Sequence, residues 1–163
     1  MNKLILKYIQ FIVLLILVLF ISHKLYQKFV VPNFVQLNQE LTHVKGSKIT
    51  VSQYNDKYVI VSYFQTWCGD CIREIPHLEE LQEKIGKEKL KVILVSDESL
   101  DKIFHFQDVR NVKLDCYQSP QSLQELGIGV YPTTYLINPE GKVVFSKLEY
   151  YNWNSNEVYN LIK

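Results

Sequence analysis

The sequence predicts an α/β fold in which a central mixed β-sheet is covered on both faces. Two short runs rich in β-branched and aromatic residues, Tyr58–Phe64 and Leu90–Val95, are typical of buried strands. A segment with helical spacing of apolar residues lies between them. A turn at Asn138–Gly141 separates two more apolar runs, 133–137 and 142–145, and predicts an antiparallel hairpin. Strands that alternate with helices and end in a hairpin indicate a mixed sheet.

The helix after the first buried strand has the clearest boundaries. It is expected from about Gly69 to Ile85, because Ile72, Ile75, Leu78 and Leu81 recur at helical spacing and Gly86 is suited to the C-cap. The other expected elements are strands at Phe34–Leu37 and Lys48–Val51 around a turn at Gly46, a helix from near Ser99, a strand at Val112–Leu114, a helix from Ser119 through Leu126, and a last helix at about 155–162.

Composition excludes several classes of protein. The chain has 163 residues, of which 47% are hydrophobic, which suffices for one globular domain with a real core. The 18 basic and 17 acidic residues are interspersed and give a net charge of +1, so nothing indicates a nucleic-acid partner. Three cysteines are too few for a disulfide-stapled scaffold.

The N-terminal segment is strongly apolar from Leu4 to Ile21, interrupted by Lys7 and Gln10. Eighteen helical residues span about 27 Å, which predicts a transmembrane anchor over residues 1–22. No small-residue cleavage site follows, and no cysteine for a lipid anchor occurs there, so an uncleaved anchor is favoured over a signal peptide. An amphipathic or buried soluble helix fits less well, because the segment has no polar face.

Two further segments complete the expected organisation: a stalk over 23–32 and a globular domain over 33–163, entered at Pro32-Asn33. Basic residues flank the apolar run almost evenly, so the positive-inside rule does not decide the orientation. A short N-terminal tail is easiest to leave in the cytoplasm. This favours an orientation in which the globular domain lies outside the cytoplasm.

Trp67-Cys68-Gly69-Asp70-Cys71 follows the first buried strand and opens the helix. A thiol at a helix N-terminus faces unpaired N–H groups and the positive end of the helix dipole, which stabilise the reactive thiolate. Two thiols three residues apart can also close a small disulfide ring. The pattern indicates reversible dithiol–disulfide exchange, with Cys68 attacking a substrate disulfide and Cys71 then releasing the product.

A metal site is the alternative interpretation of the CxxC pair. Structural zinc usually needs four ligands, and only Cys116 and the four histidines remain to supply the others. A second function stays open: a copper carrier with two cysteines and His77, six residues after Cys71, or a partner-binding module on the same fold. The favoured interpretation needs no cofactor beyond a redox-active Cys68–Cys71 disulfide.

Three stretches carry a family resemblance: residues 64–71, 74–81 and 126–143. Through them the region from Asn33 onward resembles the thioredoxin superfamily, in particular the membrane-anchored TlpA/ResA-like thiol–disulfide oxidoreductases. The resemblance implies a thioredoxin-like fold and a cis Pro132 that faces the dithiol. Trp67 and Tyr131 are then expected to line the substrate groove, with support at the site from Gly69, Asp70 and Thr133.

The same resemblance implies the cellular setting. The expected role is reduction of disulfides in extracytoplasmic proteins, for example apocytochromes in cytochrome c maturation. The expected partners are protein disulfide substrates, an electron-donating thiol–disulfide protein, and the membrane through the N-terminal helix. The expected location is the bacterial cytoplasmic membrane, crossed once, with the catalytic domain on the periplasmic side.

Two positions depart from thioredoxins proper. The buried acid that assists the second cysteine stands six residues before the first cysteine, where this chain has Ser62, so no proton acceptor for Cys71 is assigned. Asp70 replaces a proline, and its carboxylate opposes a nearby thiolate. We therefore expect Asp70 to favour a reductant.

Three features receive structural interpretations. Cys116 is expected to be a small buried hydrophobic residue. The aromatic cluster of Tyr150, Tyr151 and Trp153 is expected to pack the last helix. Ser96–Glu98 is read as the start of a helix rather than as catalytic.

Overall fold

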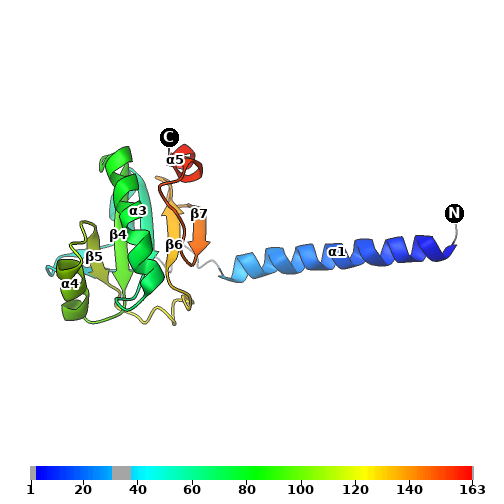
Figure 1. The fold of residues 1–163 in the computed structure, drawn as a ribbon, viewed down its shortest axis with the longest axis horizontal. Helices are drawn as coiled ribbons and strands as arrows, with labels where there is room; N and C mark the ends of the chain where they lie inside the picture. The colour runs from blue at the N-terminus through cyan, green and yellow to red at the C-terminus, as the bar shows by residue number, and fades with distance from the viewer. Residues whose placement is uncertain (1–2, 31–37, 163) are drawn as a thin grey trace. The chain divides into compact units, whose positions relative to one another are not determined.

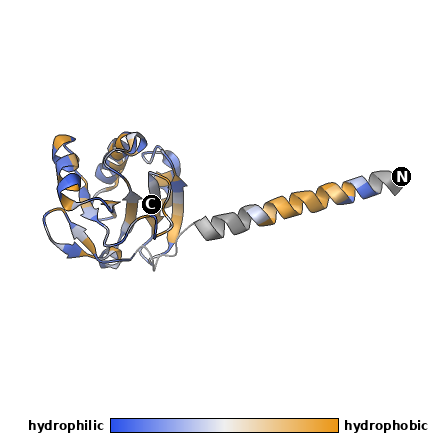
Figure 2. Cartoon of the chain, turned by 90° about the horizontal axis from the view of Figure 1, so that it is seen from below, coloured by the Kyte–Doolittle hydropathy of each residue, from blue (hydrophilic) through white to orange (hydrophobic). Residues whose placement is uncertain are grey.

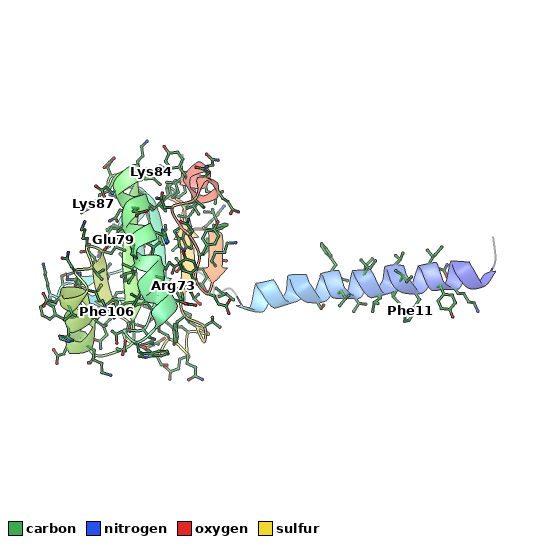
Figure 3. The ribbon with its side chains drawn as sticks, viewed as in Figure 1. Phe11, Arg73, Glu79, Lys84, Lys87 and Phe106 are labelled. Carbon is green, nitrogen blue, oxygen red and sulfur yellow. A yellow bond between two sulfur atoms is a disulfide. The ribbon has the colours of Figure 1, made fainter. Side chains whose placement is uncertain are left out.

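The computed structural model describes residues 3–30 and 38–162, and the chain divides into two compact units, residues 1–33 and 34–163. The first unit is the helix α1 (Lys3–Val30), so residues 23–30 of the predicted stalk are helical. The side chains described on α1, from 7 to 22, are all exposed, and the apolar ones among them form the orange band of Figure 2. Phe11, labelled in Figure 3, is 65% exposed.

The sequence predicts a membrane span over residues 1–22, which the structure describes only in part. Among the described residues, no helix combines the length and the apolarity that a bilayer crossing requires. The described part of α1 is apolar without interruption from Phe11 to Ile21, with Lys7 and Gln10 before this run and Ser22 after it.

The second unit is built on one mixed seven-stranded sheet (Figure 1). The strand order is β2-β1-β5-β4-β3-β6-β7. The pairs β3–β4 and β4–β5 are parallel, and the other four pairs are antiparallel, which confirms the predicted mixed sheet. The strands are β1 (Leu41–His43), β2 (Lys48–Ile49), β3 (Tyr58–Tyr63), β4 (Leu90–Ser96), β5 (Asp115–Gln118), β6 (Thr133–Ile137) and β7 (Val143–Leu148).

Helices cover one face of the sheet. They are α3 (Gly69–Ile85), α4 (Leu100–Val109) and α5 (Asn156–Ile162), and their buried residues share one core cluster with alternate residues of the strands. In β3, Ile60 and the following Phe64 belong to this cluster, while Val59 and Val61 belong to the cluster on the opposite face. Ser62 lies between Ile60 and Phe64 in this alternation, so it is on the face covered by α3.

On the opposite face, the described residues of this unit form no helix beyond the short 3-10 turn η1 (Val51–Tyr54). The predicted helix from Ser119 through Leu126 was wrong: this stretch forms turns. A carboxylate oxygen of Asp97 accepts the backbone N–H of Leu123 at 2.8 Å, and Leu123 in turn accepts from Ile128 N at 2.8 Å. These bonds hold the segment as a loop, yet Leu123, Leu126 and Ile128 are still buried against the sheet.

One predicted strand begins later in the chain than expected. The strand expected at Val112–Leu114 begins at Asp115 instead. The backbone before Asp115 is hydrogen-bonded to a helix side chain and not to a strand, because Glu79 accepts from Lys113 N at 2.7 Å. The strand expected at Phe34–Leu37 lies outside the described residues, and among those described β2 pairs with β1. The predicted α3 is confirmed from Gly69 to Ile85, and its C-cap Gly86 has the positive φ of 93° that favours glycine.

Candidate active site

The two cysteines of the CxxC pair form a disulfide where β3 leads into α3. Cys68 is the N-cap of the helix, and its Sγ accepts the backbone N–H of Cys71 at 3.1 Å. Cys68 is 6% exposed and Cys71 is 1% exposed, so the first sulfur is the one nearer to solvent. A sulfur that already accepts a helix N–H is placed to carry negative charge once the disulfide opens.

A wall of aromatic and proline residues stands beside the disulfide. The Tyr131–Pro132 peptide bond is cis, as the family resemblance implies. Trp67 is 71% exposed and packs edge-on against Tyr131, with ring centroids 6.1 Å apart. Thr133 begins β6 opposite Tyr63, and its hydroxyl donates to Val130 O at 2.7 Å, which ties the cis loop to the sheet. The predicted groove residues Trp67, Tyr131, Pro132 and Thr133 are therefore neighbours in two loops that meet.

The two residues between the cysteines differ in their surroundings. Nothing lies within 4 Å of a Cβ built on Gly69, so this position is open. Asp70 accepts a hydrogen bond from Arg73 Nη2 at 2.6 Å, and both side chains are about half exposed. Arg73 lies on the first turns of α3, at the end opposite Lys84 (Figure 3). The carboxylate that was expected to oppose the Cys68 thiolate is thus paired with a cation.

Arg73→Gln is expected to make the Cys68/Cys71 couple more reducing. The substitution leaves the Asp70 carboxylate unpaired near the developing thiolate, and an exposed charge of this kind changes the equilibrium constant a few-fold. Equilibration with glutathione measures the change. Asp70→Asn is expected to shift the equilibrium the other way, and the double variant to lie near wild type. Identical equilibrium constants for all four proteins at low salt would contradict this account.

Glu74, one turn after Cys71 on α3, is a buried carboxyl beneath the disulfide. It is 1% exposed, and each of its oxygens accepts a hydrogen bond: Oε1 from the Trp153 indole N–H and Oε2 from the Thr134 hydroxyl at 3.2 Å. Burial raises the pKa of Glu74 to about 8, while the hydrogen-bond donors partly oppose that rise. A carboxyl with a pKa near neutrality is able to take up and release a proton at physiological pH.

Ser62, the position where thioredoxins proper carry an acid, is connected to this carboxyl. The Thr134 hydroxyl lies 2.8 Å from Ser62 Oγ and 3.2 Å from Glu74 Oε2. The Thr134 hydroxyl has a single proton. When this proton is donated to Glu74, the Thr134 oxygen accepts a hydrogen bond from the Ser62 hydroxyl. A buried acid therefore lies next to this position, on the facing helix and not on β3. Sequence reasoning missed Glu74, although its position between Cys71 and Ile75, Leu78 on the apolar stripe of α3 marks it as buried.

The loop that carries Trp67 is held by two carboxylates. Glu98 accepts from Thr66 N at 2.6 Å and from Thr66 Oγ1 at 3.0 Å, and Asp97 accepts from Gln65 Nε2 at 2.6 Å. The interpretation of Ser96–Glu98 as a helix start was incomplete: the N-cap of α4 is Ser99, and the two acids anchor the active-site loop. Sequence gives no sign of these contacts, because the partners are 32 residues apart.

The remaining cysteine and the histidine candidate lie outside this site. Cys116 is fully buried within β5, and burial raises its pKa to about 12, so its thiol is unreactive in the folded protein. His77 Nε2 lies 3.0 Å from the Tyr150 hydroxyl. Within the described part of the chain, no three histidine, cysteine or acidic side chains are grouped so as to hold a metal ion.

A mixed sheet, a cysteine pair at a helix N-terminus and a cis-proline loop opposite define a thioredoxin-like dithiol protein. Comparison with known proteins agrees with this class. Residues 30–146 match the AhpC/TSA family, and the chain belongs to that family.

Curated relatives extend the likeness to thiol-disulfide oxidoreductases. The proteins named thiol-disulfide oxidoreductase ResA from Bacillus thuringiensis (strain Al Hakam) and Bacillus subtilis (strain 168) are each 30% identical over 116 residues. These regions cover 69% of this chain and 64% and 62% of the two relatives, so the match spans slightly less than two thirds of their length.

Solved structures show the same fold. The thioredoxin domain of a thiol-disulfide oxidoreductase from Bacteroides vulgatus has a TM-score of 0.68 and 19% identity, over 77% of this chain and 93% of that one. A thioredoxin-family thiol:disulfide interchange protein from Chlorobium tepidum has a TM-score of 0.63 and 18% identity, over 81% of this chain and 97% of that one. The predicted thioredoxin-like architecture is thereby confirmed.

Proposed function

We propose that this protein is a thiol–disulfide oxidoreductase that reduces disulfides in other proteins. The observation that carries the proposal is the Cys68–Cys71 disulfide at the N-terminus of α3, with Cys68 Sγ accepting a helix N–H. The buried Glu74 carboxyl, one turn further along the helix, supplies the proton acceptor that such chemistry requires. The names of the ResA relatives support the same activity.

The first step is attack of the Cys68 thiolate on a substrate disulfide. A bond forms between Cys68 Sγ and one substrate sulfur, and the other substrate sulfur leaves as a thiolate. The exposed ring of Trp67 and the cis loop at Tyr131–Pro132 offer an apolar surface for the substrate on the solvent side of Cys68. Extended substrate backbone is expected to dock along this loop.

The second step requires a deprotonated Cys71. Its thiol gives its proton to the Glu74 carboxylate, and the resulting thiolate attacks Cys68 Sγ. The bond between Cys68 and the substrate breaks, and the second substrate sulfur leaves as a thiolate, so that two electrons have passed to the substrate. Glu74 with a pKa of about 8 in the disulfide form retains the proton that it received.

The proposed setting is outside the cytoplasm, where disulfides in protein substrates persist. Oxidised apocytochrome c is a specific substrate class to test, and an unidentified thiol–disulfide protein returns the electrons. Labelling of intact cells with a membrane-impermeant thiol reagent checks the location: Cys68 is expected to react after mild reduction.

Insulin reduction by the purified full-length chain tests the activity. Cys68→Ser and Cys71→Ser are each expected to reduce the rate to that of dithiothreitol alone, because each removes one half of the exchange. Cys71→Ser is also expected to accumulate a mixed disulfide through Cys68. Cys116→Ala, which removes a buried thiol outside the site, is the matched control and should retain wild-type turnover. Stoichiometric copper binding without turnover would instead indicate the carrier function.

A further inference from the structure

The segment that follows β7, Glu149–Asn154, lies along α3 and is called the strap here. It begins beside the cis loop, where Glu149 N donates to Pro132 O at 2.8 Å. The aromatic ring of Tyr150 then lies 4.6 Å from the Arg73 guanidinium carbon, and its hydroxyl is 3.0 Å from His77 Nε2. The strap therefore touches the cis loop and the first turns of α3 in succession.

The end of the strap makes two more contacts with α3. Asn154 Nδ2 donates to Glu80 Oε2 at 2.9 Å, and the indole N–H of Trp153 donates to Glu74 Oε1. The α3 residues Arg73, His77 and Glu80 recur every three or four positions and so form one stripe. The strap follows this stripe on the outside of the helix and inserts one side chain, Trp153, beneath it.

Trp153 is held in a single position. It is fully buried and packs edge-on against Phe145 and Tyr151, with ring centroids 5.6 and 5.7 Å away. Core packing, which the sequence suggested, explains the ring but not the direction of its N–H. That N–H donates to Glu74 Oε1, while the Thr134 hydroxyl donates to the other carboxylate oxygen, Oε2.

We propose that Trp153 is a positioning residue of the redox site: through its indole N–H the strap fixes the Glu74 carboxylate and sets how readily it takes the Cys71 proton. The inference rests on the proposed function for its kinetic consequence. It goes beyond that function because it assigns a role in the redox chemistry to a segment outside the family match, which ends at residue 146.

The surroundings of Glu74 leave few other groups able to do this. The hydroxyls of Thr134 on β6 and Ser62 on β3 face it from the sheet, and Cys71 precedes it on α3. Among the described residues Glu74 has no ion pair, since its basic neighbours Arg73 and His77 contact Asp70 and Tyr150 instead. The neighbouring parts of β7 and α5 contribute apolar side chains to this core.

Trp153→Phe tests the proposal, because phenylalanine keeps an aromatic ring in the cluster and lacks the N–H. Infrared titration of the oxidised full-length chain follows the protonated carboxyl of Glu74, whose band is assigned by its loss in Glu74→Gln. Loss of a donor to the charged form is expected to raise the proton affinity of Glu74 about tenfold. In the reduced protein, the pH profile of mixed-disulfide release should move to higher pH by about one pH unit, which corresponds to the same tenfold change.

Two controls make the result decisive. Tyr151→Phe perturbs the same aromatic cluster without touching Glu74, and should leave the titration unchanged. If Trp153→Phe fails to fold, replacement of Trp153 by its benzothienyl isostere removes only the N–H. An unchanged Glu74 titration in a folded variant of either kind overturns the proposal. Absence of any disulfide exchange in wild type would refute the proposed function instead, and the titration of the oxidised protein would still decide the role of Trp153.

Discussion

Replacing Glu74 by glutamine is expected to flatten the pH dependence of stability of the oxidised protein. Burial raises the pKa of Glu74 from the ordinary value of 4.5 to about 8. Between these values the folded chain holds a proton that the unfolded chain releases, so the contribution to stability is full below pH 4.5 and is lost as the pH rises through 8. The loss is on the order of 5 kcal/mol. Glu74→Gln removes the titrating group and with it this loss.

Urea unfolding of the oxidised chain between pH 5 and pH 9 measures the effect. The variant should lose less stability than wild type over this range and be the more stable protein at pH 9. Glu83→Gln, which changes an exposed glutamate on the same helix, is the matched control and should follow wild type. Parallel curves for wild type and Glu74→Gln would mean that this carboxyl is not kept protonated by burial.

Glu98→Ala is expected to loosen the loop that carries Trp67 and to lower stability by about 2–3 kcal/mol. The Glu98 carboxylate is 10% exposed and accepts both the backbone N–H and the hydroxyl of Thr66. Its truncation leaves these donors without their partner, directly before Trp67 and Cys68 in the chain. Disulfide exchange should slow together with the loss of stability, because the helix start and the aromatic wall share this anchor.

Denaturant unfolding and insulin reduction on the same samples check this expectation. Glu98→Gln keeps one acceptor oxygen and should lose about half as much stability. Lys102→Ala breaks only the exposed ion pair to Glu98, whose atoms are 3.9 Å apart, and should change stability little. If alanine and glutamine at position 98 behave alike, the hydrogen bonds to Thr66 do not hold the loop.

The fold was predictable wherever local chemistry decides the structure. The apolar run of β3, the helical stripe of α3 and the glycine at position 86 gave the boundaries of the central elements. Prediction failed where side chains distant in sequence satisfy the backbone. The segment 119–126 has helical composition, but Asp97 takes the N–H of Leu123 and the segment stays a loop. The start of β5 moved because Glu79 takes the N–H of Lys113.

The candidate site shows the same division. The position of Cys68 and Cys71 at a helix start follows from a strand pattern, a helix pattern and their junction. The hydrogen-bonded environment of Glu74 does not, because its donors come from residues 134 and 153, 60 and 79 positions away.

The location of the Trp153 indole matters for the choice of boundaries when a truncated fragment of this protein is produced. The recognisable family region stops at residue 146, and a fragment designed on that boundary would contain both sulfurs, the cis-proline and the whole of α3. It would omit the side chain that sits under them. Such a truncated protein would retain the recognised motif, but the redox properties measured on its cysteine pair would not be those of the full-length chain.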